Sequence, residues 1–327
     1  MKIILVGLTY DLREDYLKMG FSKEETAEFD KIDTIEGIEE ALHFNGYETE
    51  RIGNVNALML QLINRKRWDI VFNICEGLYG IGREAQVPAI LDIYKIPYTF
   101  SDPMVLSLTL HKAMAKRIVR DLGLNTPDFF VINKIEELKN ENHPYPLFAK
   151  PLSEGTGKGI DDKSKVNNFE QLFDTVKNLL EKFNQPVLVE EYLPGREFTV
   201  GIVGTGNETK STGLMEVKLL NQNEELIYSY HNKENYKGVI DYTIPEKEIK
   251  DACEELAVAA WKGLECRDGG RVDIRIDKNG KPAFIEVNPL AGLNPVHSDL
   301  PILSRKNGLE YNELIGIIMK SAIQRIG

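Results

Sequence analysis

Residues 270–289 read GRVDIRIDKNGKPAFIEVNP, with polar and apolar residues alternating on both sides of an Asn-Gly pair. This alternation around Asn-Gly predicts a β-hairpin. With a two-residue loop, Asp273 would lie opposite Glu286, and Arg271 opposite Asn288. Facing carboxylates repel each other, unless a divalent cation binds between them. Because Mg²⁺ usually takes one or two carboxylates together with substrate phosphates, the hairpin suggests a magnesium–nucleotide site.

The same alternation is also typical of a solvated edge hairpin without any ligand. A three-residue bulged loop would shift the register and spoil the pairing of Asp273 with Glu286. The hairpin alone therefore leaves both interpretations open.

The bulk properties of the chain limit its class. A length of 327 residues exceeds a typical single core, so two or three domains are expected. A net charge of −11 argues against general binding of nucleic acid. The chain has three cysteines without a CxxC pair, no signal peptide, and no apolar stretch long enough for a membrane span. We therefore expect a cytoplasmic protein that binds neither nucleic acid nor a membrane.

The first hundred residues alternate between strand-like and helix-like patterns. Such β–α–β–α–β alternation predicts a parallel, doubly wound α/β sheet. The Gly-rich segment 76–82 follows the third strand, where open α/β sheets bind ligands. The expected strands span residues 2–7, 47–52 and 68–75, and the expected helices span 34–45, 55–65 and 83–94.

Past a break near residue 102, the pattern changes to a mixed α+β region. A helix over 105–123 is expected to carry Lys112 and to end at Gly123. The other expected strands span 129–132, 147–151, 186–192 and 197–203, and the other expected helices span 168–183, 251–263 and 310–325.

A glycine-rich loop follows Lys150, which ends a predicted strand. Residues 153–160 read SEGTGKGI, and their glycines would let backbone N–H groups approach an anion. The spacing fits neither a Walker A loop nor a dinucleotide fingerprint. The loop could also be a plain flexible turn. Its position directly after Lys150, at the end of a predicted strand, instead indicates a loop that closes over the phosphate groups of a ligand.

Residues 190–197, EEYLPGRE, join two predicted strands through a Pro-Gly turn. The backbone of such a segment can pair with a purine edge, while a carboxylate holds ribose hydroxyls. An ordinary hairpin is the simpler reading of this segment alone.

The order of these motifs resembles the ATP-grasp superfamily, and within it the D-alanine–D-alanine ligase family. The resemblance rests on the lysine before the glycine-rich loop, on EEYLPGREFTV and on GGRVDIRID…FIEVNPLAGL. It implies an ATP-grasp fold in three parts, with ATP between the last two. These parts are a pre-ATP-grasp N-terminal domain (1–102), a central lid (103–185) and a C-terminal subdomain with the metal site (186–327).

The resemblance also assigns roles by matching position. Phosphate groups of ATP would meet Lys112, Lys150, Lys233 and the loop residues Gly155, Gly157 and Lys158. The adenine region would be lined by Glu190, Glu191 and Leu193, with Glu197 on the ribose. Mg²⁺, or Mn²⁺ in its place, would bind Asp273, Glu286 and Asn288. Arg271 and the backbone of Gly292 would face the oxyanion, Thr156 would stand where the family usually has serine, and Ser298 would hold the second substrate's carboxylate.

The implied activity is ATP-dependent formation of an amide bond between amino acids through an acyl phosphate. The partners would be ATP and amino acids, and a homodimer is one expectation for the assembly. Three alternatives stay open: a ligase for another carboxylate and amine, a nucleotide-binding homologue without catalysis, and a dinucleotide-dependent oxidoreductase. The last is disfavoured because no G-x-G-x-x-G follows Val6.

The departures from the family pattern fall in the amino-acid pocket. Glu76 stands where the family usually has histidine, and no early serine-glutamate motif is recognisable. Glu234 follows Lys233 where the family has tyrosine, and the loop after Asn288 is one residue longer. Glu76 is expected either to pair with a substrate ammonium or to cap a loop amide.

Overall fold

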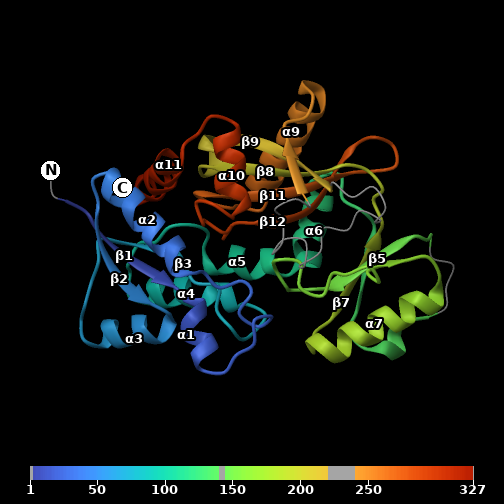
Figure 1. Ribbon diagram of the computed structural model, residues 1–327, viewed down its shortest axis with the longest axis horizontal. Coiled ribbons are helices and arrows are strands. Elements are labelled where there is room, and N and C mark those ends of the chain that lie inside the picture. The colour runs from blue at the N-terminus through green and yellow to red at the C-terminus, as the bar shows by residue number, and fades with distance from the viewer. Residues whose placement is uncertain (1–2, 140–143, 220–239, 327) are drawn as a thin grey trace.

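The computed structural model describes residues 3–139, 144–219 and 240–326, and these contain three β-sheets (Figure 1). The first sheet is parallel, with strand order β2-β1-β3, as the alternating pattern predicts. Helix α2 buries Ile35, Ile38 and Leu42 against it. The elements of this part are β1 (Leu5–Tyr10), α1 (Arg13–Lys18), α2 (Ile32–Phe44), β2 (Glu48–Gly53), α3 (Val55–Ile63), β3 (Ile70–Ile74), η1 (Arg83–Ala85) and α4 (Gln86–Ile93).

The predicted long helix over 105–123 is wrong, because the structure has two helices there. Helix α5 (Pro103–Leu110) ends at His111, and α6 (Lys112–Asp121) begins directly after it. The His111 ring accepts a hydrogen bond from the Met114 N–H, so it caps α6. The N–H of Lys112 turns to the Leu152 carbonyl at 3.3 Å, outside the helix. The break thus places Lys112 in the first turn of a new helix.

The second sheet is antiparallel, with order β4-β7-β5-β6, and α7 (Phe169–Phe183) packs on it. Asn168 caps α7 through the N–H of Gln171. The sheet lies on both sides of the predicted boundary at 185/186, and the division into three parts stays a prediction. Its elements are β4 (Phe129–Ile132), η2 (Ile135–Glu137), β5 (Leu147–Pro151), β6 (Lys165–Val166) and β7 (Val187–Glu191).

The third sheet is antiparallel, with order β10-β9-β8-β11-β12. Helix α9 covers one face with the fully buried Trp261, while α10 and α11 share a core with α2 of the first part (Figure 1). Helix α10 was not expected from the sequence. The elements are β8 (Glu197–Val203), η3 (Gly206–Glu208), β9 (Lys210–Leu219), β10 (Ile240–Thr243), α9 (Lys247–Gly263), β11 (Gly269–Ile276), β12 (Pro282–Asn288), α10 (Asp299–Lys306) and α11 (Tyr311–Gln324).

The hairpin β11–β12 has the predicted pairing but not the predicted loop. Asp273 lies opposite Glu286 and Arg271 opposite Asn288, as expected. The N–H of Asp277 bonds to the Lys281 carbonyl at 2.8 Å, so three residues form the loop. The register then shifts between Asp273 and the next residue, which leaves Ile285 as an extra residue on β12. This bulge offsets the longer loop and restores the carboxylate pair.

The buried Asp268 links the N-terminal part of the chain to the part that contains the third sheet. Its carboxylate accepts hydrogen bonds from the Phe100 N–H at 2.7 Å, the Ser321 hydroxyl at 2.8 Å and the Arg325 guanidinium at 2.5 Å. Across the described residues, no helix combines the length and apolarity that crossing a bilayer requires.

Candidate active site

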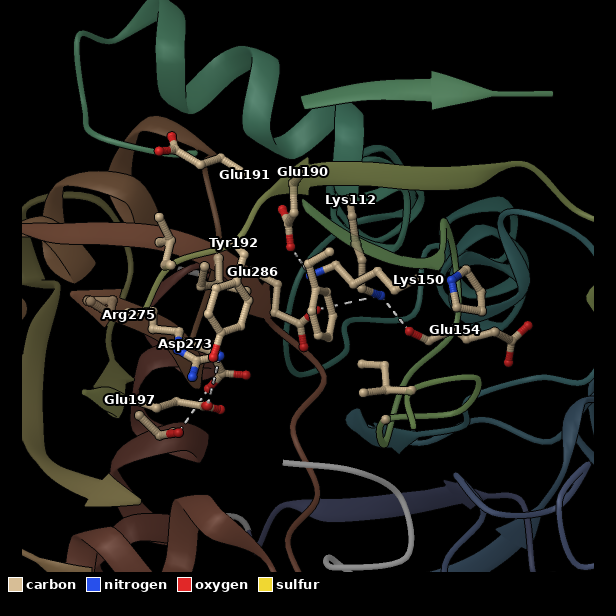
Figure 2. A pocket seen from close by; sticks show the side chains of 18 of the residues that line it. Lys112, Lys150, Glu154, Glu190, Glu191, Tyr192, Glu197, Asp273, Arg275 and Glu286 are labelled. Atoms are coloured by element: carbon tan, nitrogen blue, oxygen red, sulfur yellow. Dashed lines mark hydrogen bonds and ion pairs between the residues drawn. The ribbon is translucent and has the colours of Figure 1, made fainter. Parts of the chain in front are cut away.

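A cleft with about 930 Å³ of space, including the solvent at its opening, lies between the second and third sheets (Figure 2). A second space, the inner pocket, shares lining residues with this cleft. Four residues line both spaces: Lys112, Glu154, Arg271 and Glu286. The other predicted cofactor and metal residues that line the cleft are Lys150, Gly157, Lys158, Glu190, Glu191, Leu193, Glu197 and Asp273. The predicted residues that line only the inner pocket are Glu76, Gly155, Thr156, Asn288 and Gly292.

Two lysines of the cleft are held in place by polar partners. The Lys112 ammonium donates to the Glu154 carbonyl and lies 3.6 Å from the Glu286 carboxylate (Figure 2). Lys150 on β5 lies 2.7 Å from Glu190 on β7. These contacts restrict both ammonium groups to positions at the cleft, where they can neutralise an anion.

Glu190 lies between two lysines rather than facing the cleft alone. The Lys116 ammonium contacts its second carboxylate oxygen at 2.9 Å, and Lys116 is fully buried. Burial lowers the pKa of Lys116 to about 8, against the opposing attraction of Glu190. The two lysines outweigh the burial of Glu190 and hold its pKa below the usual range. Glu190 therefore fixes the position of Lys150.

The hairpin carboxylates are the acidic centre of the cleft. Asp273 accepts from Arg271 at 2.6 Å, from the Thr199 hydroxyl at 3.0 Å and from the Asn288 amide at 3.3 Å. Arg271 also lies 3.6 Å from Asp299 at the start of α10. Side chains of β11 and β12 thus converge on one spot at the mouth of the inner pocket.

The donor set of the hairpin fits a hard divalent cation. Two carboxylates and one amide would supply oxygens from Asp273, Glu286 and Asn288, which suits Mg²⁺ when substrate phosphates complete its shell. The described part of the chain has no cluster of three or more His, Cys, Asp or Glu side chains able to hold a metal. An all-protein metal cage is therefore not what these residues form, and a metal shared with a phosphate ligand fits them better.

The glycine-rich loop is held by a carboxylate from the first part of the chain. Glu28 accepts a hydrogen bond from the Gly155 N–H at 2.6 Å and lies 3.5 Å from Lys158. Thr156 and Gly157 have φ of +49° and +74°, a left-handed backbone that glycine adopts without strain. The Gly155 N–H and the Lys158 ammonium are thus both engaged by Glu28, and the role of the loop as a phosphate cover stays a prediction.

The far end of the cleft is aromatic. The rings of Phe148 and Tyr192 lie nearly parallel, with centroids 6.5 Å apart, and the Arg275 guanidinium lies 5.2 Å from the Tyr192 ring. Arg275 also approaches Glu197 at 3.9 Å (Figure 2). A flat aromatic ligand with a hydroxylated sugar fits such walls.

The inner pocket is acidic. Glu76 follows β3, and Glu84 lies in η1. Burial raises the pKa of Glu76 well above its usual range, with Glu84 as the next cause. Burial also raises the pKa of Glu84 to about 7, against the opposing effect of Arg83. The Thr156 hydroxyl is buried and has no hydrogen-bond partner among the described residues.

One predicted residue of the described chain does not line these spaces. Ser298 is not among the described residues that line either one. Its hydroxyl lies beside Gly292 and accepts the Asn294 N–H at 3.0 Å. Lys233 lies outside the described residues.

Sequence reasoning missed several residues of the site. Lys116 follows Lys112 by one helical turn, and Arg275 shares a strand face with Arg271 and Asp273, so periodicity could have indicated both. Glu28 lies in a polar segment without a pattern. The other missed residues that line the two spaces include Phe148, Glu84, Tyr192 and Thr199.

The three sheets, with a cleft between the second and third, define a protein with the ATP-grasp fold. A family model described as D-ala D-ala ligase C-terminus matches residues 118–320. The D-alanine--D-alanine ligase of Aquifex aeolicus (strain VF5) is 32% identical over 319 residues, which cover 97% of this chain and 99% of that one. The chain therefore belongs to the D-alanine–D-alanine ligase family, a family of ATP-dependent ligases.

Two further comparisons agree with this assignment. The D-alanine--D-alanine ligase of Thermotoga petrophila is 30% identical over 290 residues, 88% of this chain and 90% of that one. The crystal structure of D-alanine--D-alanine ligase from Bacillus anthracis complexed with ATP superposes with a TM-score of 0.75 at 23% identity, covering 98% of each chain. The predicted ATP-grasp fold, family and enzyme class are confirmed.

Proposed function

We propose that this chain joins two amino acids in an ATP-dependent, amide-forming reaction of the D-alanine–D-alanine ligase type. The observation that carries the proposal is the convergence of Asp273 and Glu286 with Lys112 and Arg271, where the cleft meets the inner pocket. A triphosphate can lie on the cleft side of this point, and an amino acid on the pocket side.

The cleft residues would bind ATP. Lys112, Lys150 and the loop residues Gly155, Gly157 and Lys158 would hold the phosphates, with Lys233 as an additional contact. The adenine would lie against Tyr192 near Glu190, Glu191 and Leu193, and Glu197 would bind the ribose. The charges and walls of the cleft support this placement.

Asp273, Glu286 and Asn288 would hold Mg²⁺, with Mn²⁺ as a substitute. The ion would supply neutralisation of the transferring phosphate charge. Asn288 now donates its amide to Asp273, so its side chain would rotate to offer the oxygen to a cation.

The chemistry needs a good leaving group on the first amino acid. One oxygen of its carboxylate attacks the γ-phosphorus of ATP, the bond to the bridging oxygen breaks, and ADP leaves. The amine of the second amino acid then attacks the carbonyl carbon of the acyl phosphate, a proton leaves the nitrogen, and phosphate departs. Arg271 and the Gly292 N–H would stabilise the oxyanion, where one lost donor costs about 3 kcal/mol.

The second amino acid would bind near Ser298 and Thr156. The Ser298 oxygen accepts the Asn294 N–H, which leaves the Ser298 O–H able to donate to a substrate carboxylate. A homodimer, a cytoplasmic location and the absence of nucleic-acid partners stay predictions, the last supported by the net charge of −11.

A ligase for a different pair of amino acids is the second candidate. Glu76 and Glu84 favour it, because they make the inner pocket more acidic than one substrate ammonium requires. The position of Glu76 after β3 is also where the family pattern usually has histidine.

Product identification tests the proposal. The protein is incubated with ATP, Mg²⁺ and a mixture of D- and L-amino acids, and mass spectrometry identifies the products. We expect a dipeptide, ADP and phosphate in equal amounts, and none of them with Asp273→Asn. Hydrolysis of ATP without any amide product would contradict the proposed function.

A further inference from the structure

We propose that the first amino acid activated by this enzyme carries a second amino group in its side chain, held by Glu76 and Glu84. This inference rests on the proposed ligase function, because it names the substrate class of the same site. The two carboxylates reach the inner pocket from neighbouring elements, the end of β3 and η1.

Neither carboxylate forms an ion pair with a cation among the described residues. Within residues 3–139, 144–219 and 240–326, no lysine or arginine forms an ion pair with Glu76 or Glu84. Both residues are partly buried and line the pocket. A ligand that enters the pocket therefore meets two carboxyl groups that form no ion pair with the described lysines and arginines.

The remaining charges of the pocket are already balanced. Glu28 contacts Arg83 at 3.0 Å, and the Glu154 carboxylate contacts Lys158 at 3.3 Å. The other two pairs join Lys112 to Glu286 and Arg271 to Asp273. Glu76 and Glu84 are thus the acidic residues lining the pocket for which the described residues show no ion pair.

An amino acid with a neutral side chain supplies only one ammonium. It would leave one of the two carboxylates unpaired, and a buried unpaired charge is costly. In the empty pocket, the two carboxyl groups can avoid an unpaired charge by binding a proton. Burial favours this protonation because it raises the pKa of both groups. A second ammonium replaces that proton and forms a charge-assisted hydrogen bond, which is stronger than a neutral one.

The Thr156 hydroxyl is a separate indication that a polar ligand enters here. Its oxygen is buried and lacks a hydrogen-bond partner within the described part of the chain, although the residue lines the same pocket. Its backbone has φ +49°, an uncommon conformation for threonine. Buried polar groups are normally satisfied, so a ligand atom would complete this one.

The orientation of the bound amino acid follows from the residues on two sides of the inner pocket. Arg271 and Gly292 come from β11 and the loop after β12, at the opening to the cleft, whereas Glu76 and Glu84 come from the first part of the chain. The substrate carboxylate would thus point toward the phosphate-binding groups, and its amino groups toward the two glutamates.

Paired substrates test the inference. Lysine is compared with norleucine, and ornithine with norvaline, as D- and L-enantiomers, with alanine as the second substrate and phosphate release as the readout. We expect kcat/KM for one enantiomer of each diamino acid to exceed that of its neutral partner by about tenfold or more. Mass spectrometry confirms that the diamino acid is in the product.

Two variants and one control test whether the two carboxylates cause the preference for diamino acids. In Glu76→Gln and Glu84→Gln, the ratio of kcat/KM between lysine and norleucine should fall toward one, while KM for ATP stays within about twofold. Glu40→Gln, on the exposed face of α2, is the matched control and should keep the wild-type ratio. Thermal unfolding of each variant establishes that it is folded. Should both variants retain the wild-type ratio, the assignment to these carboxylates is overturned.

The outcomes separate the inference from the proposed function. If alanine supports turnover but lysine is no better than norleucine, the inference is wrong and the ligase function stands. If no amino acid supports ATP-dependent turnover, the ligase function fails. Calorimetry with a non-hydrolysable ATP analogue, Mg²⁺ and the wild-type protein then still decides the inference: tighter binding of lysine than of norleucine supports it, and equal binding overturns it.

Discussion

The carboxylate of Glu28 accepts a 2.6 Å hydrogen bond from the N–H of Gly155, which lies 127 positions further along the chain. The same carboxylate contacts the Arg83 guanidinium at 3.0 Å and the Lys158 ammonium at 3.5 Å. One acidic side chain thus joins the N-terminal part, the segment after β3 and the glycine-rich loop.

We expect Glu28→Gln to lower the free energy of unfolding by about 3 kcal/mol, because it leaves the buried Arg83 without its carboxylate. Urea denaturation measures the change. The control is Glu24→Gln, which removes an exposed ion pair with Lys182 and should have little effect. A loss no larger for Glu28→Gln than for this control would mean that the contact contributes little.

Substitution of the hairpin carboxylates should abolish turnover without unfolding the protein. In Asp273→Asn and Glu286→Gln, the side chains keep their size but lose the charge that a divalent cation requires. We expect kcat to fall by at least about a thousandfold, with the melting temperature changed by only a few degrees. Glu255→Gln on the exposed side of α9 is the control. Wild-type turnover in either hairpin variant would rule out the metal assignment.

The two lysines that contact Glu190 should differ in their effects. Lys150 lines the cleft, so Lys150→Met should raise KM for ATP about tenfold or more. Lys116 is buried behind it, so Lys116→Met should chiefly lower the free energy of unfolding, by about 3 kcal/mol. Steady-state kinetics and urea denaturation of both variants test this division. It fails if Lys116→Met raises KM for ATP as much as Lys150→Met does.

The inner pocket predicts a pH dependence of amino-acid binding. Burial raises the pKa of Glu84 to about 7, with Glu28 raising it further and Arg83 and Lys112 lowering it. Below pH 7 its carboxyl is neutral and binds an ammonium weakly, and above pH 7 it is charged. At saturating ATP, KM for a diamino acid should therefore fall as the pH rises from 5.5 to 8.5.

The control for this pH profile is Glu84→Gln, in which the fall of KM near pH 7 should shrink. An identical profile in wild type and variant would assign the titration to another group. Glu76 is the next candidate, since burial and Glu84 raise its pKa as well.

The sequence predicted the parts of the site that lie on regular elements. Alternation along 270–289 placed Arg271, Asp273, Glu286 and Asn288 on one face, because side chains of a strand alternate strictly between two faces. The break between α5 and α6 could not be predicted in this way. It depends on the N–H of Lys112 bonding to Leu152, a contact between segments distant in sequence.

The acidic side of the inner pocket was only half predicted. Glu76 was found from its position after a strand and from the family pattern. Glu28 lies in a polar segment without a repeating pattern, and Glu84 lies at the start of the helix predicted over 83–94 but was not singled out. Their location depends on how the first part packs against the glycine-rich loop, which no local periodicity encodes. The sequence also could not show that the Ser298 hydroxyl accepts a hydrogen bond from the Asn294 N–H within the same loop.

The extra residue at Ile285 ties the length of an exposed turn to the chemistry inside the cleft. Shortening the Lys278–Gly280 turn by one residue, without removing the bulge, would slide β12 by one position. Glu286 would then point to the opposite face of the sheet, away from Asp273. Natural variation in the length of this turn should thus be permitted only when strand β12 gains or loses a residue at the same time.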